Sequence, residues 1–151
     1  MKLYVAYGSN LDKMQMKYRC PGARPVYSGH LENWQLIYRG SKTRAYASIR
    51  YKKGFRVPVG IWEITADNER SLDMYEGYPS FYQKKNIYVH LEDGSRVKAM
   101  VYIMRSDATP GVPSKQYMRT ILRGYADFHL DENYLIESLI RNREETGKER
   151  V

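Results

Sequence analysis

The stretch Tyr7-Gly8-Ser9-Asn10-Leu11 stands between two segments of different character. Residues 2–6 form a short β-prone run, and residues 12–19 are predicted to form one or two turns of helix. Gly8 lets the backbone come close to a ligand, and the first N–H groups of the following helix have no intrahelical acceptor. Such a turn can receive a carboxylate, a phosphate or a developing oxyanion. Taken alone, it is equally consistent with a plain strand–turn–helix connection capped by Ser9 or Asn10.

Length and composition indicate one cytoplasmic domain. A chain of 151 residues can bury one real core, and we predict a single domain over residues 1–151. No apolar run approaches the roughly 20 residues that a membrane-spanning helix needs, and no signal peptide is apparent. The single cysteine, Cys20, allows no intramolecular disulfide, which agrees with a reducing compartment. We therefore expect a cytoplasmic protein without membrane contact.

The chain is basic, with 25 Lys and Arg against 17 Asp and Glu and a formal charge of +8. This excess can serve nucleic-acid binding or attract a small anionic substrate. Nucleic-acid-binding proteins normally combine a basic patch with a recognisable module. Here the basic residues are scattered, as at Lys52-Lys53 and Lys84-Lys85. We interpret them as a solvated basic face and expect no nucleic-acid partner.

Hydrophobic periodicity and turn residues divide the chain into strands and helices. Strands are predicted at residues 24–31, 34–38, 46–52, 57–64, 82–91 and 96–104, with turns at 40–41, 53–54 and 92–95 and a loop at 108–113. After the first helix, further helices are predicted at 66–76, with Thr65 as N-cap, at 115–129 and at 132–144. The pattern predicts an α+β fold, a small mixed, mostly antiparallel β-barrel or roll with flanking helices.

Glu76 is the best candidate for a general acid/base. It lies one turn after Leu72, so it shares the apolar face of its predicted helix. It also lies in the last turn, just before Gly77, where the negative end of the helix dipole disfavours a carboxylate. The dipole and any burial would raise its pKa toward the useful range. The alternative is a surface glutamate at a helix end. Glu63 and Asp73 compete for the role, but Asp73 lies off the Leu72–Glu76 line.

Other chemistries have weaker signals. His30, His90 and His129 are far apart, with no carboxylate or cysteine at metal-ligand spacing, so we predict no metal site. Ser9 lacks the G-x-S-x-G elbow of a hydrolase nucleophile, because Leu11 stands two residues after it. No P-loop or dinucleotide fingerprint is present, and we expect no cofactor.

Four segments in order along the chain resemble the gamma-glutamylcyclotransferase-like superfamily. They are Tyr7-Gly8-Ser9-Asn10-Leu11, Gly60-Ile61-Trp62-Glu63-Ile64, Leu72-Asp73-Met74-Tyr75-Glu76-Gly77, and Pro113-Ser114-Lys115-Gln116-Tyr117 followed by Gly124-Tyr125-Ala126. The similarity covers roughly residues 2–140. It implies a small mixed β-barrel with flanking helices, in agreement with the fold class predicted above.

The resemblance implies a cofactor-independent enzyme that cyclises a γ-glutamyl amide to 5-oxoproline and releases the free amine or amino acid. The substrate's own α-amine is the nucleophile, so the protein needs only to orient the chain, stabilise an oxyanion and move protons. The resemblance makes Glu76 the acid/base and places residues 7–11 around the γ-glutamyl group. It also places Tyr82 and Tyr117 in the pocket lining. The alternative for both, above all for Tyr82, is an ordinary half-buried aromatic side chain.

The substrate is the least defined part of this hypothesis. Tyr-Gly-Ser-Asn-Leu replaces the Tyr-Gly-Ser-Leu-Ile-Trp of the glutathione-degrading branch, which disfavours glutathione. We expect the loops at residues 41–44 and 106–113 to contact the leaving amine. Two other hypotheses remain open: a non-catalytic small-anion-binding module on the same fold, which the presence of Glu76 disfavours, and a basic nucleic-acid-binding protein.

Overall fold

The computed structural model describes residues 1–105 and 107–149. Within these residues, the strands that form the barrel are β1 (Lys2–Ala6), β2 (Arg24–Gly40), β3 (Ala45–Ile64), β4 (Tyr82–Leu91) and β5 (Arg96–Met104). Their order is β3-β1-β5-β4-β2, and pairing of β2 with β3 closes the ring. β1 and β5 are parallel, and the other barrel pairs are antiparallel. The predicted small mixed, mostly antiparallel β-barrel is therefore confirmed.

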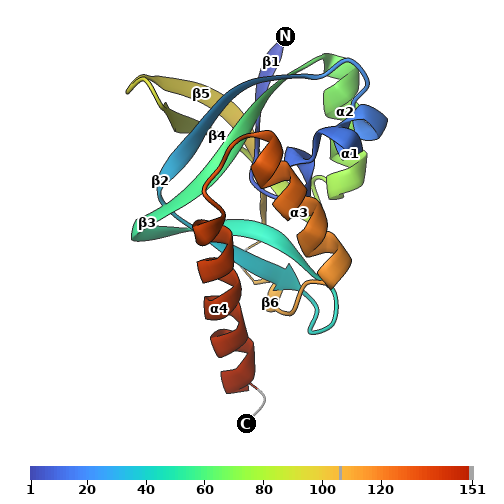
Figure 1. Ribbon diagram of the computed structural model, residues 1–151. Helices are drawn as coiled ribbons and strands as arrows, with labels where there is room; N and C mark the ends of the chain where they lie inside the picture. Colours follow the sequence, from blue (N-terminus) through green and yellow to red (C-terminus); the bar gives the residue numbers. More distant parts are fainter. Residues whose placement is uncertain (106, 150–151) are drawn as a thin grey trace.

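Helices flank the barrel on several sides (Figure 1). They are α1 (Lys13–Arg19), α2 (Ala66–Glu76), α3 (Lys115–Asp127) and α4 (Glu132–Glu149), together with the short 3-10 turn η1 (Ser9–Leu11). α1 packs against α2, α3 against η1, and α4 along β2. Thr65 caps α2 as predicted, because its hydroxyl accepts from the N–H of Asn68 while the Asn68 side chain accepts from the N–H of Thr65. No helix in the described part of the chain is long and apolar enough to cross a membrane.

The predicted breaks within two strands were wrong. Residues 24–31 and 34–38 belong to one strand, β2, and residues 46–52 and 57–64 belong to β3. Instead of a break, the register shifts between Glu32 and Trp34, where Asn33 has a φ of 64°. The N–H of Gly54, in the predicted turn, donates to Asn33 Oδ1 at 3.0 Å. The turn-forming residues therefore produce a bulge that bends a long hairpin, because pairing resumes on both sides of it.

The remaining boundaries differ by a few residues. α3 ends at Asp127 rather than at residue 129, and α4 continues to Glu149 rather than ending at residue 144. The predicted loop at residues 108–113 contains a two-residue strand, β6 (Thr109–Pro110), that pairs with the end of β2.

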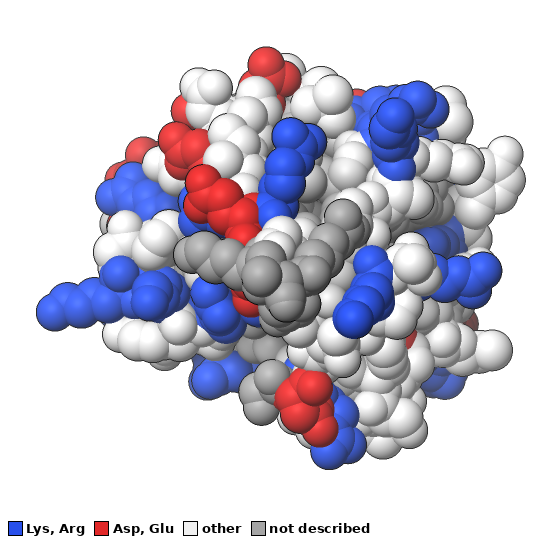
Figure 2. Space-filling view, turned by 90° about the horizontal axis from the view of Figure 1, so that it is seen from below, with Lys and Arg blue, Asp and Glu red and all other residues white. Residues whose placement is uncertain are grey.

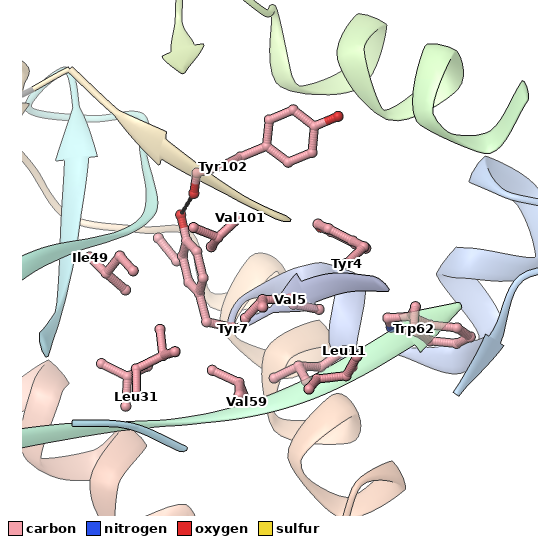
Figure 3. Packing of buried hydrophobic residues seen from close by; sticks show 14 of the residues in the cluster. Tyr4, Val5, Tyr7, Leu11, Leu31, Ile49, Val59, Trp62, Val101 and Tyr102 are labelled. Atoms are coloured by element: carbon pink, nitrogen blue, oxygen red, sulfur yellow. Dashed lines mark hydrogen bonds between the residues drawn. The ribbon is translucent and has the colours of Figure 1, made fainter. Parts of the chain in front are cut away.

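The core fills the barrel and continues beneath the helices. Val5 of β1 lies among Leu31, Ile49, Val59 and Val101, which come from three other strands, β2, β3 and β5, and are all buried (Figure 3). Near the end of β1, the Tyr7 hydroxyl donates to the Tyr102 carbonyl at 2.7 Å (Figure 3). The second half of β1 is thus buried at the centre of the fold, and the turn follows directly from it.

α3 holds this turn from the outside. A Cβ at Gly124 would lie 2.4 Å from Leu11 Cβ, so only glycine permits such close packing. Arg123 Nη2 pairs with Asp12 Oδ2 at 2.8 Å, and Asp127 Oδ2 accepts from the Lys13 N–H at 2.9 Å. The late helix therefore fixes both the turn after β1 and the start of α1.

Basic side chains on the surface are interspersed with acidic and neutral ones. On the face shown in Figure 2, Lys and Arg stand in separate groups with neutral surface and Asp or Glu between them. Arg56 pairs with Glu32, and Lys84 pairs with both Glu69 and Asp73. On this face the basic residues form no continuous stripe of the kind that follows a nucleic-acid backbone.

Candidate active site

A cavity of about 360 Å³ opens where the turn after β1, the end of α2 and the start of α3 meet. Most of the residues that the sequence suggested for a site line it, namely Tyr7, Gly8, Ser9, Asn10, Glu76, Tyr82 and Tyr117. Leu11 differs, because its side chain is fully buried under α3. Its N–H donates to the Gly8 carbonyl at 3.0 Å, so Leu11 shapes the turn without lining the cavity.

Glu76 reaches the cavity because α2 ends at this residue. Gly77 follows with a left-handed φ of 62°, and its N–H donates to the carbonyls of Asp73 and Met74. This arrangement terminates the helix. Leu72, one turn before Glu76, is fully buried. The face of α2 that packs on the core therefore also carries Glu76, which is largely but not fully shielded from solvent.

The side chain of Asn10 connects the turn to Glu76. Asn10 Nδ2 donates to Glu76 Oε1 at 3.3 Å and to the Tyr4 hydroxyl at 2.8 Å. Asn10 Oδ1 accepts from Gln15 Nε2 at 3.1 Å and from Arg19 Nη1 at 2.9 Å. Since both of those partners carry donors, the amide oxygen must face them, and the amide nitrogen then faces the carboxyl of Glu76.

Burial dominates the electrostatics of Glu76. It raises the pKa of this carboxyl to about 7, while the positive charge of Arg19 and the hydrogen bond from Asn10 lower it. A carboxyl with this pKa is present in both protonation states at neutral pH, so it can both accept and donate a proton. Burial also raises the pKa of the Tyr7 and Tyr82 hydroxyls, which keeps them protonated.

The two tyrosines suggested by the family resemblance flank Ala47 of β3. The Tyr82 hydroxyl donates to the Ala47 carbonyl at 2.8 Å, and the Ala47 N–H donates to the Tyr117 hydroxyl at 2.9 Å. Because the Tyr117 oxygen is an acceptor here, its own proton can be donated into the cavity. An added Cβ at Gly8 would lie 3.2 Å from Ala47 Cβ and 3.4 Å from the Tyr117 hydroxyl. Gly8 of the turn, Ala47 of β3 and Tyr117 of α3 are thus packed closely together.

The other carboxylates considered from the sequence do not line the cavity and have partners of their own. Asp73 Oδ1 accepts from the Tyr102 hydroxyl at 2.6 Å, and Lys84 Nζ pairs with Asp73 at 2.8 Å. Glu63 pairs with Arg24 between β3 and β2. In residues 1–105 and 107–149, no three His, Cys, Asp or Glu side chains are gathered so that they could hold a metal ion.

Several cavity residues were missed by sequence reasoning. Gln15 and Arg19 had a usable signal, because residues four apart on α1 share a face and this face follows directly on the turn. Tyr46 and Phe81 had none, since only the fold brings them to the turn. The further lining residues are Tyr4, Val5, Ala47, Tyr75 and Tyr102. The described part of the predicted leaving-amine loops, 41–44 and 107–113, does not line this cavity, and Ser106 lies outside the described residues.

Comparison with known proteins identifies the family of the chain. The profile of the family described as "Gamma-glutamyl cyclotransferase, AIG2-like" matches residues 4–119. The chain belongs to this family. The match confirms the resemblance predicted from four segments. Its range contains the turn after β1, Glu76, Tyr82 and Tyr117, and it ends within α3.

Individual members of the family are distant relatives in sequence. The gamma-glutamylcyclotransferase of Homo sapiens is 28% identical over 141 residues, which cover 87% of this chain and 74% of that protein. The mouse (Mus musculus) gamma-glutamylcyclotransferase is 29% identical with the same coverage. A solved structure of a gamma-glutamyl cyclotransferase has a TM-score of 0.81 at 27% identity, covering 91% of this chain and 85% of that chain. The barrel with its flanking helices is therefore the fold of this family.

Proposed function

We propose that this cavity cyclises a γ-glutamyl amide to 5-oxoproline and releases the free amine or amino acid. The observation that carries the proposal is the position of Glu76, whose carboxyl has a pKa of about 7 and is hydrogen-bonded by Asn10 of the turn. Membership of the family supports the reaction type, because the human and mouse relatives are gamma-glutamylcyclotransferases.

The reaction requires one bond to form and one to break. The substrate's α-nitrogen attacks its own γ-carbonyl carbon and closes a five-membered ring, and the bond from that carbon to the leaving nitrogen then breaks. The α-ammonium loses two protons and the leaving nitrogen gains two, so the reaction consumes no proton overall. In this proposal, ionised Glu76 takes a proton from the α-nitrogen, and protonated Glu76 gives one to the leaving nitrogen.

The turn after β1 supplies donors for the substrate. The N–H groups of Leu11 and Asp12 are used within the turn, since each donates at 3.0 Å to the carbonyl three residues before it. Those of Ser9 and Asn10 are the first of η1 and have no intrahelical acceptor. We assign these two N–H groups to the developing oxyanion, and the guanidinium of Arg19 to the α-carboxylate of the glutamyl group.

The test is to incubate the protein, without added cofactor, with a panel of γ-glutamyl amino acids and γ-glutamyl amines and to assay 5-oxoproline. We expect 5-oxoproline from at least one compound, together with an equal amount of free amine. Binding of panel members without any 5-oxoproline would contradict the proposal and favour a small-anion-binding module. Steeply salt-dependent binding of DNA or RNA, with no effect of γ-glutamyl compounds, would favour the nucleic-acid hypothesis.

A further inference from the structure

The mouth of the cavity is aromatic. Three of its lining residues are large and exposed: Tyr46 at 40%, Tyr75 at 57% and Phe81 at 41% of their surface. We call Tyr46, Tyr75 and Phe81 the aromatic rim. The tyrosines deeper in the cavity, such as Tyr7 and Tyr82, are buried. Exposed apolar rings gathered at one opening are typical of a surface that binds something.

Two rings of the rim are held in a fixed arrangement. Tyr46 contacts Tyr117 edge-to-face at 5.4 Å between ring centroids, and Phe81 contacts Tyr82 in the same manner at 5.3 Å. Tyr46 and Phe81 are also arranged edge-to-face, with 6.5 Å between their ring centroids. The Phe81 N–H donates to the carbonyl of Gly77 at 2.7 Å. The segment that follows Glu76 therefore also positions Phe81. The rings of Tyr46 and Phe81 extend the aromatic wall of the cavity from the buried tyrosines to its mouth.

The charged side chains near the mouth offer few partners to an ionic ligand. Arg19 lies over the Tyr75 ring, 4.6 Å from its centroid, and also donates to Asn10. Among the described lining residues, Glu76 and Arg19 are the charged side chains, and Glu76 is the proposed proton carrier. A cationic group on the substituent of the leaving amine would meet the Arg19 charge without an acidic partner of its own. A carboxylate on the leaving group would compete with the glutamyl group for Arg19.

We propose that the aromatic rim is the subsite for the leaving amine, and that the substrate is a γ-glutamyl amide whose nitrogen carries an aromatic substituent without a charged group. This inference rests on the proposed function, which places the glutamyl group at the turn and the amide nitrogen beside Glu76. The substituent on that nitrogen must then extend outward, past Tyr46 and Phe81. An aromatic substituent would pack edge-to-face or offset against these rings.

Four substrates that share the γ-glutamyl group test this assignment: the benzylamide, the methylamide, the phenylalanine conjugate and the putrescine conjugate. The readout is kcat/KM for release of 5-oxoproline. We expect the benzylamide to exceed the methylamide about tenfold or more, mainly through a lower KM. We also expect it to exceed the phenylalanine conjugate, which adds a carboxylate, and the putrescine conjugate, which adds a cation.

Variants locate this preference in the structure. Phe81→Ala and Tyr46→Ala should each bring the ratio of benzylamide to methylamide activity close to one. The ratio does not depend on the amount of folded enzyme, so a variant of low stability remains informative. Tyr88→Ala is the matched control, because Tyr88 is 53% exposed on β4 and lies outside the cavity lining. It should leave the ratio at the wild-type value.

The outcomes separate the two proposals. Equal kcat/KM for the benzylamide and the methylamide, or a preference for the charged conjugates, would overturn the leaving-amine subsite while the proposed cyclisation stands. If the preference for the benzylamide persists in Phe81→Ala and Tyr46→Ala, the aromatic rim is not its source. If none of the four compounds yields 5-oxoproline, the proposed function fails for these substrates, and the subsite that rests on it fails as well.

Discussion

Asn10 Nδ2 lies 3.3 Å from Glu76 Oε1, and this contact joins the turn after β1 to the last residue of α2. The amide oxygen of Asn10 is held in turn by Gln15 and Arg19 of α1. Three elements thus converge on one carboxyl. Its position relative to the turn is fixed before any substrate arrives, which is what a proton carrier acting on a bound substrate requires.

The pKa of Glu76 predicts a pH dependence that Arg19 controls. The base form requires an ionised carboxyl, so kcat/KM should fall on the acid side with a midpoint near pH 7. Arg19 lowers this pKa, and Arg19→Gln should therefore move the midpoint to higher pH, as measured from the pH profile of 5-oxoproline release. Arg70→Gln serves as control, since Arg70 is exposed on α2 and pairs with Asp67. An unchanged or lower midpoint in Arg19→Gln would contradict this account.

Glu76 should also lower the stability of the folded protein at neutral and alkaline pH. Its folded pKa of about 7 lies above the ordinary value of 4.5, so ionisation opposes folding as the pH rises between these values. Glu76→Gln should raise the free energy of unfolding by on the order of 2–3 kcal/mol at pH 8. At pH 4 the two proteins should be equally stable, because the carboxyl is then protonated in the folded state. Urea unfolding at both pH values measures this, and equal stability at pH 8 would contradict it.

Ionisation of Glu69 should have the opposite effect on stability from ionisation of Glu76. Its hydrogen bond from Lys84, with a further contribution from Lys2, lowers its pKa, so its ionised form stabilises the fold. Glu69→Gln should cost about 1 kcal/mol at pH 7, because these pairs are partly exposed. The stabilisation is lost as the pH falls through the folded pKa, so the difference between variant and wild type should shrink in acid. A loss that stays constant down to low pH would indicate that packing, rather than charge, is responsible.

Gly8→Ala should perturb the cavity wall. Its Cβ would lie 3.2 Å from Ala47 Cβ and 3.4 Å from the Tyr117 hydroxyl, so one of these groups must move. We expect a loss of about 1–2 kcal/mol in stability and weaker binding of 5-oxoproline, measured by calorimetry. Gly147→Ala is the control, since a Cβ there meets nothing within 4 Å and alanine favours the helix. Unchanged binding of 5-oxoproline by Gly8→Ala would show that this contact does not shape the site.

Local patterns in the sequence predicted most elements, and they failed where pairing between distant segments decided the outcome. The Thr65 cap and the Gly77 stop set the ends of α2 through contacts a few residues apart, which a sequence displays. By contrast, Asn33 and Gly54 look like turn residues, but they form a bulge because two long strands pair on both sides of them.

The same distinction holds for the cavity. Only the family resemblance indicated that residues 7–11 and Glu76 lie together. The position of Glu76 one turn after Leu72 indicated that it lies on the apolar face of its helix. Tyr46 and Phe81 were not predictable, because they reach the cavity mouth through the curvature of β3 and the course of the chain after α2. No periodicity or spacing in the sequence relates them to the turn.

The most direct test of Glu76 as the proton carrier is the rate of 5-oxoproline release by Glu76→Gln at saturating substrate. Glutamine keeps the shape of the side chain and can still accept the hydrogen bond from Asn10, but it cannot carry a proton. We predict that kcat falls by about 10²–10⁴-fold, while 5-oxoproline binds within a few-fold of the wild-type affinity. A Glu76→Gln protein that turns over substrate at the wild-type rate would contradict the central claim.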